Sequence, residues 1–112
     1  MPFIQINTST KSIVENDLLQ KEVSKKIAEL TGKPENYVMT MIQTNKSMTF
    51  AGSDEPCCFI NLKSIGSLNP SSMSKKLCEL ITSKTNIKAN RIYIEFNDIK
   101  ASNWGFNNST FG

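Results

Sequence analysis

The residue best suited to do chemistry is Pro2, which follows Met1 and opens the apolar run Pro2–Asn7. An aminopeptidase usually removes Met1 before a small residue, and Pro2 would then carry a free secondary amine at the head of a buried strand. A chain-terminal amine has a reference pKa of about 7.7–8.0. Burial or a nearby cation lowers that pKa, so the amine can be a neutral base near pH 7. Met-Pro starts are nevertheless common, and most N-terminal prolines do no chemistry.

The rest of the composition narrows the chemistry further. The chain contains no histidine, which excludes Ser-His and Cys-His catalysis and removes the commonest zinc ligand. We therefore expect no metal and no cofactor. Three cysteines, an odd number, argue against a disulfide framework and favour a reducing compartment such as the cytoplasm. The N-terminus has no charged region followed by an apolar one, so secretion would need a route without a signal peptide.

Length and charge indicate a single domain over residues 1–112 that binds neither nucleic acid nor membrane. A chain of 112 residues is long enough for one compact core. The net charge of +3 is dispersed, and the pairs Lys25-Lys26 and Lys75-Lys76 are typical of solvated helix faces. No stripe of basic and aromatic residues suggests nucleic acid. No apolar stretch approaches the ~20 residues of a membrane span.

The chain repeats one structural plan, with approximate repeats at residues 2–43 and 57–97 and an offset of 54 residues. Each repeat contains an apolar stripe with the spacing of one helix face. The two stripes are Leu19-Val23-Ile27-Leu30 and Met73-Leu77-Ile81. Gly32 and Pro34 are expected to end the first helix. Asn69 and Pro70 are expected to be the N-cap and first residue of the second.

Strand patterns flank both predicted helices. The expected strands are Pro2–Asn7, Tyr37–Gln43, Cys57–Lys63 and Arg91–Asn97. The fold class is therefore α+β: tandem β-α-β units, each with parallel strands, that form a four-stranded sheet with two helices on one face. Met39 and Met41 lie opposite Val38 and Ile42, so the strand is apolar on both faces. Such sheets are normally covered on both sides, and the uncovered face predicts self-association.

Several short segments, in their order and spacing, resemble the macrophage migration inhibitory factor (MIF) family of the tautomerase superfamily over essentially the whole chain. These segments are Met1-Pro2-Phe3-Ile4, Thr31-Gly32-Lys33-Pro34, Glu55-Pro56-Cys57, Ser64-Ile65-Gly66, Arg91-Ile92-Tyr93-Ile94 and Asn107-Asn108-Ser109-Thr110-Phe111. The resemblance implies a homotrimer with active sites between neighbouring subunits. It also implies keto–enol tautomerisation of small aromatic keto acids of the phenylpyruvate or dopachrome type. Many members are secreted cytokines, which implies a cell-surface receptor of the invariant-chain type.

The resemblance also implies a role for each matching residue. Pro2 would be the catalytic base, and Lys33 would attract the substrate carboxylate. The backbone amide of Ile65, beside Ser64, would add a hydrogen bond, and Tyr93 of the adjoining subunit would complete the polar rim. The apolar wall for an aryl group would come from Phe3, Trp104, Phe106 and Phe111. Taken alone, Lys33 could equally be a solvated lysine at a helix end, and the last two phenylalanines could be plain packing.

Three departures from the family pattern affect function. Glu95 stands beside Tyr93 where the family often has asparagine, and its carboxylate would repel an anionic substrate and raise the pKa of the base. Phe106 replaces a common tryptophan. Ile60 occupies the second position of the family's Cys-x-x-Cys, so we expect Cys57 and Cys58 to be buried, unpaired thiols. A weak tautomerase, a receptor-binding cytokine homologue and a structural trimer with a vestigial pocket all stay open.

Overall fold

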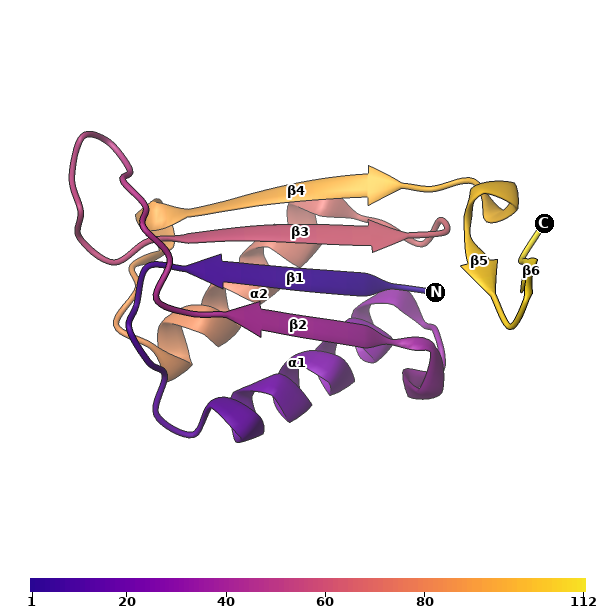
Figure 1. The fold of residues 1–112 in the computed structure, drawn as a ribbon, viewed down its shortest axis with the longest axis horizontal. Coiled ribbons are helices and arrows are strands. Elements are labelled where there is room, and N and C mark those ends of the chain that lie inside the picture. The colour runs from indigo at the N-terminus through magenta and orange to yellow at the C-terminus, as the bar shows by residue number, and fades with distance from the viewer.

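A computed structural model describes all 112 residues and contains a four-stranded sheet with two helices on one face (Figure 1). The elements that form these layers are β1 (Phe3–Thr8), α1 (Asn16–Thr31), β2 (Met39–Gln43), β3 (Cys58–Ser64), α2 (Pro70–Lys84) and β4 (Ile92–Asp98). The strand order is β2-β1-β3-β4. β1 is parallel to β2, β3 is parallel to β4, and the two central strands are antiparallel. The expected β-α-β units are therefore confirmed.

The four strands begin one or two residues later than predicted. Before β2 and β4 the reason is a short 3₁₀ turn. These turns are η1 (Glu35–Tyr37) and η2 (Ala89–Arg91). The Tyr37 amide donates to the Pro34 carbonyl at 3.0 Å, and the Arg91 amide donates to the Lys88 carbonyl at 2.9 Å. Both amides are thus used within a turn, so the ladders begin only at Met39 and Ile92.

The helix ends follow the predicted signals. Asn69 is the N-cap of α2, and Pro70 opens the helix. At the end of α1, the Thr31 hydroxyl donates to the Ile27 carbonyl at 2.6 Å, and Gly32 has a φ of 68° that suits a residue without a side chain. Thr31, not Leu30, is the last buried residue of the first stripe, because Thr31 lies one full turn beyond Ile27. Leu30 packs at the edge of the core.

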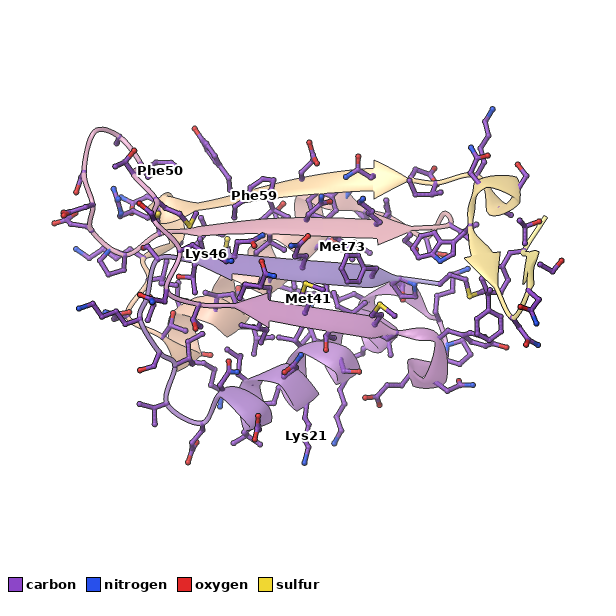
Figure 2. All side chains as sticks on the ribbon, viewed as in Figure 1. Lys21, Met41, Lys46, Phe50, Phe59 and Met73 are labelled. Atoms are coloured by element: carbon purple, nitrogen blue, oxygen red, sulfur yellow. The ribbon has the colours of Figure 1, made fainter.

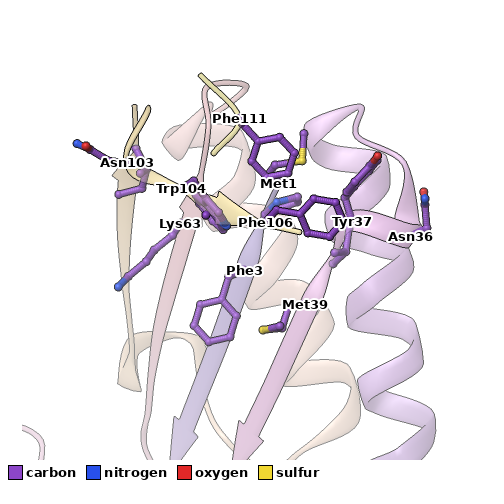
Figure 3. A pocket seen from close by; sticks show the side chains of 14 residues that line it. Met1, Phe3, Asn36, Tyr37, Met39, Lys63, Asn103, Trp104, Phe106 and Phe111 are labelled. Atoms are coloured by element: carbon purple, nitrogen blue, oxygen red, sulfur yellow. The ribbon is translucent and has the colours of Figure 1, made fainter. Parts of the chain in front are cut away.

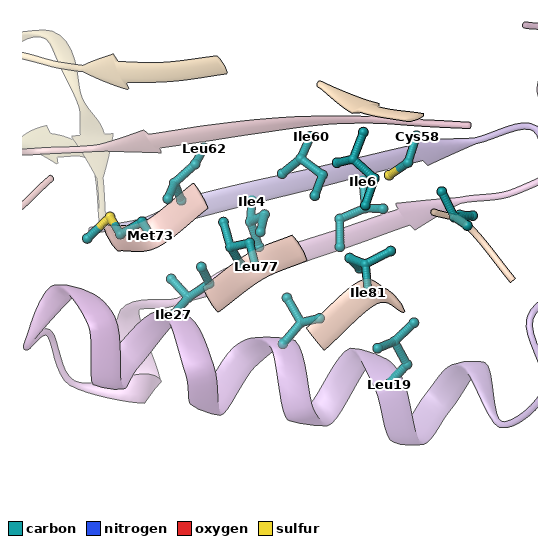
Figure 4. Close-up of a cluster of buried hydrophobic side chains, with 13 residues drawn as sticks. Ile4, Ile6, Leu19, Ile27, Cys58, Ile60, Leu62, Met73, Leu77 and Ile81 are labelled. Carbon is teal, nitrogen blue, oxygen red and sulfur yellow. The ribbon is translucent and has the colours of Figure 1, made fainter. Parts of the chain in front are cut away.

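One core serves both repeats. Ile6 pairs directly with Ile60, and their numbers differ by the repeat offset of 54, so a local twofold axis passes between them. The alternation along β1 and β3 turns Ile4, Ile60 and Leu62 towards the helices, where they are fully buried (Figure 4). The complete cluster is Ile4, Ile6, Leu19, Val23, Ile27, Cys58, Ile60, Leu62, Met73, Leu77, Ile81, Ile87 and Ile92. Neither helix is both long and apolar enough to cross a membrane.

The other face of the sheet is open and mixed in polarity. Met39 and Tyr93 are 64% and 65% exposed, and Figure 2 shows Met41 and Phe59 on the same open side. A hydrogen-bonded polar group lies between these apolar side chains: the Asn97 amide donates to Asn61 at 2.8 Å and to Glu95 at 3.1 Å. The apolar side chains at the two edge strands agree with the expected second apolar face.

Arg91 anchors the long loop between β2 and β3 to the start of β4. Its guanidinium donates to the main-chain carbonyls of four loop residues, which are Phe50 (3.0 Å), Ser53 (3.3 Å), Glu55 (2.9 Å) and Pro56 (3.0 Å). It also lies 5.3 Å from the centre of the Phe50 ring. The same ring packs against Tyr93, with the two centroids 4.6 Å apart. A buried arginine therefore holds both the loop and the aromatic contact made by Tyr93.

We predict that Arg91→Met destabilises the fold by about 3 kcal/mol, because it leaves several loop carbonyls without a donor. Chemical denaturation at a fixed protein concentration measures this change. Lys88→Met is the matched control, since Lys88 is exposed and its side chain makes no hydrogen bond or ion pair. Equal stability of the two variants would contradict the anchoring role.

Candidate active site

Pro2 lies at the end of the sheet from which the central strand β1 starts. It directly precedes β1, whose neighbours are β2 and β3. The Met39 amide donates to the Pro2 carbonyl at 3.0 Å, and the proline ring is buried. The pairing of β1 with β2 therefore extends to Pro2 and fixes its position at this end of the sheet.

A cavity of about 600 Å³ opens beside Pro2 (Figure 3). Nine of its fourteen lining residues are hydrophobic. The lining consists of Met1, Pro2, Phe3, Asn36, Tyr37, Val38, Met39, Lys63, Ile99, Asn103, Trp104, Gly105, Phe106 and Phe111. Five of the residues predicted for the site are thus brought together: Pro2, Phe3, Trp104, Phe106 and Phe111. The size and the apolar lining of the cavity suit a small aromatic molecule.

The C-terminal segment builds the aromatic wall of the cavity. After the short turn η3 (Ala101–Asn103), the strands β5 (Gly105–Phe106) and β6 (Ser109–Thr110) form a hairpin near the N-terminus (Figure 1). Asn107 and Asn108 have φ values of 53° and 66°, as the tight two-residue turn requires. Phe106 stacks on Phe111 at 5.4 Å, and Tyr37 meets the two rings edge-on at 5.7 and 6.2 Å.

The chain-terminal amine next to the cavity is electrostatically perturbed. Partial burial lowers the pKa of the Met1 amine below its ordinary value, and the positive charge of Lys33 lowers it further. Lys33 follows the C-cap of α1 and does not line the cavity. Its charge nevertheless acts on the amine in the direction expected for a neighbour of the site.

Ser64 and Ile65 lie close to Pro2 but outside the cavity lining. Lys63 pairs with Phe3 across the central strands, so the chain passes Pro2 at the next position, Ser64. The Ser64 side chain is fully buried on the helix side of the sheet, and its hydroxyl has no hydrogen-bond partner. Ser64 therefore borders the proline from the core side.

Tyr93 and Glu95 are distant from Pro2 within one protomer. Tyr93 pairs with Phe59, and Phe59 pairs with Asn7 at the far end of β1. Asn7 lies five positions beyond Pro2, which is about 16 Å at roughly 3.3 Å per residue. Glu95 pairs with Asn61, which pairs with Gln5, and neither Glu95 nor Tyr93 lines the cavity. A single chain does not bring these two side chains into the cavity, so their predicted role requires a second copy of the chain.

Sequence reasoning missed Tyr37 and Lys63 as cavity residues. Tyr37 is the first residue of the predicted strand Tyr37–Gln43, whereas in the structure the turn η1 directs it towards Phe106. Lys63 was the last residue of a predicted strand, but its place depends on the pairing of β1 with β3. The repeat predicted the parallel pairs inside each unit and did not identify the neighbours between units. An antiparallel pairing of the first and third strands would have placed Lys63 beside Phe3.

The cysteines form no disulfide. Cys57 and Cys58 are buried, Cys78 is partly buried, and all three thiols are free. Burial raises the pKa of Cys58 to about 12, with smaller contributions from Cys57 and Cys78, and burial also raises the pKa of Cys78. Ile60 lies in the core at the second position of the interrupted motif. The expectation of buried, unpaired thiols at Cys57 and Cys58 is confirmed, and no group of acidic, cysteine or histidine side chains is arranged to hold a metal.

Two β-α-β units that share a four-stranded sheet, with a proline at the head of a central strand, define the fold of the tautomerase superfamily. The family model for macrophage migration inhibitory factor matches residues 1–112. The chain belongs to the MIF family.

Relatives and solved structures match over almost the full length of both chains. The MIF homologue of Brugia malayi is 40% identical over 115 residues and covers 100% of each chain. MIF of Xenopus laevis is 38% identical and covers 99% of each. The crystal structure of the MIF homologue from Prochlorococcus marinus has a TM-score of 0.93 and 45% identity, covering 98% of this chain and 99% of that one. The structure of MIF from Trichinella spiralis has a TM-score of 0.91 and 33% identity, covering 97% of this chain and 99% of that one.

Proposed function

We propose that this protein is a keto–enol tautomerase for phenylpyruvate- or dopachrome-type substrates, with the Pro2 amine as catalytic base after removal of Met1. The observation that supports this function most strongly is the buried proline beside an aromatic cavity, next to a Met1 amine whose pKa is lowered by burial and by Lys33. Keto and enol forms differ only in the position of one proton. A neutral base in a water-poor cavity is therefore sufficient, and no cofactor is needed.

In this mechanism the Pro2 nitrogen takes the enol hydroxyl proton and delivers it to the neighbouring carbon, or carries out the reverse transfer. The aromatic wall formed by Phe106 and Phe111 holds the aryl group, and Lys33 attracts the carboxylate from the end of α1. The backbone amide of Ile65 supplies a further hydrogen bond. A fixed orientation of the reacting carbon against the base also accelerates the reaction, because the two groups are already aligned before the proton moves.

The lowered amine pKa has a defined consequence for pH dependence. A base must be unprotonated. Burial and the charge of Lys33 lower the pKa of the Met1 amine, and the same two causes would lower the pKa of the Pro2 amine once Met1 is removed. Activity should therefore fall as the pH decreases through the pKa of the Pro2 amine. Below that pKa the amine carries a proton and cannot accept another.

Self-association as a homotrimer would complete the site. The open sheet face exposes Met39, Met41 and Tyr93, and β2 and β4 are unpaired edge strands. Tyr93 and Glu95 reach a Pro2 cavity only if that cavity belongs to another subunit. In that position the exposed Glu95 carboxylate would oppose an anionic substrate and slow its turnover, which is the departure expected from the sequence.

We predict that sedimentation equilibrium at micromolar concentration gives about three times the 12.5 kDa mass of the chain. The physical reason is burial of the apolar side chains on the open face. Met41→Glu should weaken the association because it places a charge on that face, whereas Lys88→Glu should not. A clean monomer for the unmodified chain would contradict both the assembly and the shared active site.

A second candidate function is cytokine-like signalling through a cell-surface receptor of the invariant-chain type. The relatives that support it are named macrophage migration inhibitory factor or its homologue, and they align with almost the whole chain. We propose a cytoplasmic protein that can also be secreted without a signal peptide, since its free buried thiols suit a reducing compartment. Retention of receptor binding in a variant without tautomerase activity would separate signalling from the enzyme. A structural trimer with a vestigial pocket would lack both properties.

We predict that Pro2→Gly lowers kcat/KM for phenylpyruvate on the order of 10²-fold or more, because it makes the amine primary, mobile and differently aimed. An absorbance assay of enol-to-keto conversion measures the loss. Pro70→Ala is the matched control, since Pro70 opens α2 and does not line the cavity. It should keep the activity of the unmodified protein.

Retention of Met1 provides a second test of the same base. An extra lysine between Met1 and Pro2 prevents removal of the methionine and converts the proline nitrogen into an amide. We expect no activity from this protein once its intact mass is verified. Full activity would show that another residue is the base.

A further inference from the structure

We propose that Phe50 is a positioning residue for the reaction: its ring fixes the orientation of Tyr93, and Tyr93 then presents one defined surface to the cavity of a neighbouring copy of the chain. This inference rests on the proposed tautomerase function with its shared active site. It adds a residue of the long loop between β2 and β3 that neither the repeat pattern nor the family motifs singled out.

Tyr93 has few neighbours that determine its orientation. It projects from the edge strand β4 on the open face of the sheet, where it is 65% exposed. Its cross-strand partner on β3 is Phe59. The Phe50 ring packs against it with the two centroids 4.6 Å apart and the two planes inclined by 60°. A largely exposed side chain can adopt several rotamers, and a favourable aromatic contact on one side selects among them.

Phe50 is itself held in place by its main chain and by its ring. Phe50 and Ser53 exchange two main-chain hydrogen bonds, of 2.9 and 3.0 Å, across a two-residue turn. The turn residues Ala51 and Gly52 have φ values of 54° and 73°, as such a tight turn requires. The Arg91 guanidinium donates to the Phe50 carbonyl at 3.0 Å and lies 5.3 Å from the centre of the ring. Tyr93 therefore packs against a fixed surface.

The effect of the Phe50 ring can be separated from the anchoring of the loop. Arg91 holds the loop through main-chain carbonyls, which every residue type supplies. A substitution of Phe50 leaves these acceptors in place, whereas a substitution of Arg91 removes their donor. Variants of Phe50 therefore test the contact with Tyr93 and not the anchoring of the loop.

The repeat gives an independent reason to connect Phe50 with an active site. The offset of 54 residues relates Phe50 to Trp104 and Tyr93 to Met39, and Trp104 and Met39 both line the cavity. The β2–β3 loop, which carries Phe50 (Figure 2), lies at the opposite end of the sheet from the C-terminal hairpin (Figure 1). The proline at the loop end, Pro56, is internal, so its nitrogen is an amide and not a base. This end has the aromatic side chains without a base of its own, which fits a contribution to the cavity of another copy.

The first test is a double-mutant cycle on KM for phenylpyruvate. We expect Phe50→Leu to raise KM about threefold with little change in kcat, a factor within the range that aromatic pairs contribute. Phe50→Tyr keeps the ring and should keep KM. In a Tyr93→Leu background, Phe50→Leu should have no further effect, because Phe50 acts through Tyr93. Lys88→Met, a remote and exposed control, should leave KM unchanged.

Three results of this cycle would overturn the proposal. The first is an unchanged KM in Phe50→Leu. The second is an equal increase in both backgrounds, which would show that Phe50 acts independently of Tyr93. The third is a lower mass of Phe50→Leu in sedimentation equilibrium, which would show that the ring serves assembly and not the orientation of Tyr93. Phe50→Met, which keeps a long apolar side chain without a ring, should reproduce the leucine variant.

A measurement without turnover separates failure of this proposal from failure of the proposed function. The chain has two tyrosines, so labelling with 3-fluorotyrosine allows ¹⁹F NMR to follow each of them, and Tyr37→Phe identifies the signal of Tyr93. Titration with cinnamate, an unreactive aromatic acid, should shift the Tyr93 signal, and the Kd should rise about threefold in Phe50→Leu. This response supports the positioning role even in a protein without tautomerase activity. A Tyr93 signal that cinnamate does not move, or equal Kd values for the two proteins, contradicts it.

Discussion

The antiparallel pairing of β1 with β3 is the interaction on which the rest of the structure depends. It joins two β-α-β units that would otherwise each leave a sheet edge unpaired, and it centres one core on Ile6 and Ile60. The same ladder brings Lys63 opposite Phe3 and carries the chain past Pro2. Since Pro2 precedes a strand with neighbours on both sides, a chain end that would ordinarily fray has a fixed position.

The cavity combines the two ends of the chain. The N-terminal strand supplies Pro2, and the C-terminal hairpin supplies the stacked rings of Phe106 and Phe111. Burial lowers the pKa of the Met1 amine at this end of the chain, and the charge of Lys33 acts in the same direction. One protomer therefore contains Pro2 and the aromatic wall of the cavity, while Tyr93 lies at the other end of the sheet against Phe50. We propose that a subunit interface completes the polar side of the site.

The local structure could be predicted from the sequence because each signal acts over a few residues. Helical spacing identified both stripes, and Asn69 and Gly32 marked helix ends. The alternation of apolar residues reports which face of a sheet a side chain occupies but not which strand lies beside it, because ladder bonds use main-chain groups common to all residues. Lys63 was missed for this reason, whereas Tyr37 was missed because the short turn η1 replaces the start of the predicted strand. The C-terminal aromatic wall was expected only from the resemblance to the family, since no periodicity marks the hairpin.

The most direct test of the central claim is the pKa of the Pro2 nitrogen, followed by NMR of protein labelled with ¹⁵N-proline and verified by mass to lack Met1. We predict one titration with a midpoint below the ordinary range of about 7.7–8.0 for a chain-terminal amine. The midpoint should move upwards in Lys33→Met, because that variant removes the neighbouring positive charge. A midpoint within or above the ordinary range would contradict the assignment of Pro2 as a neutral base.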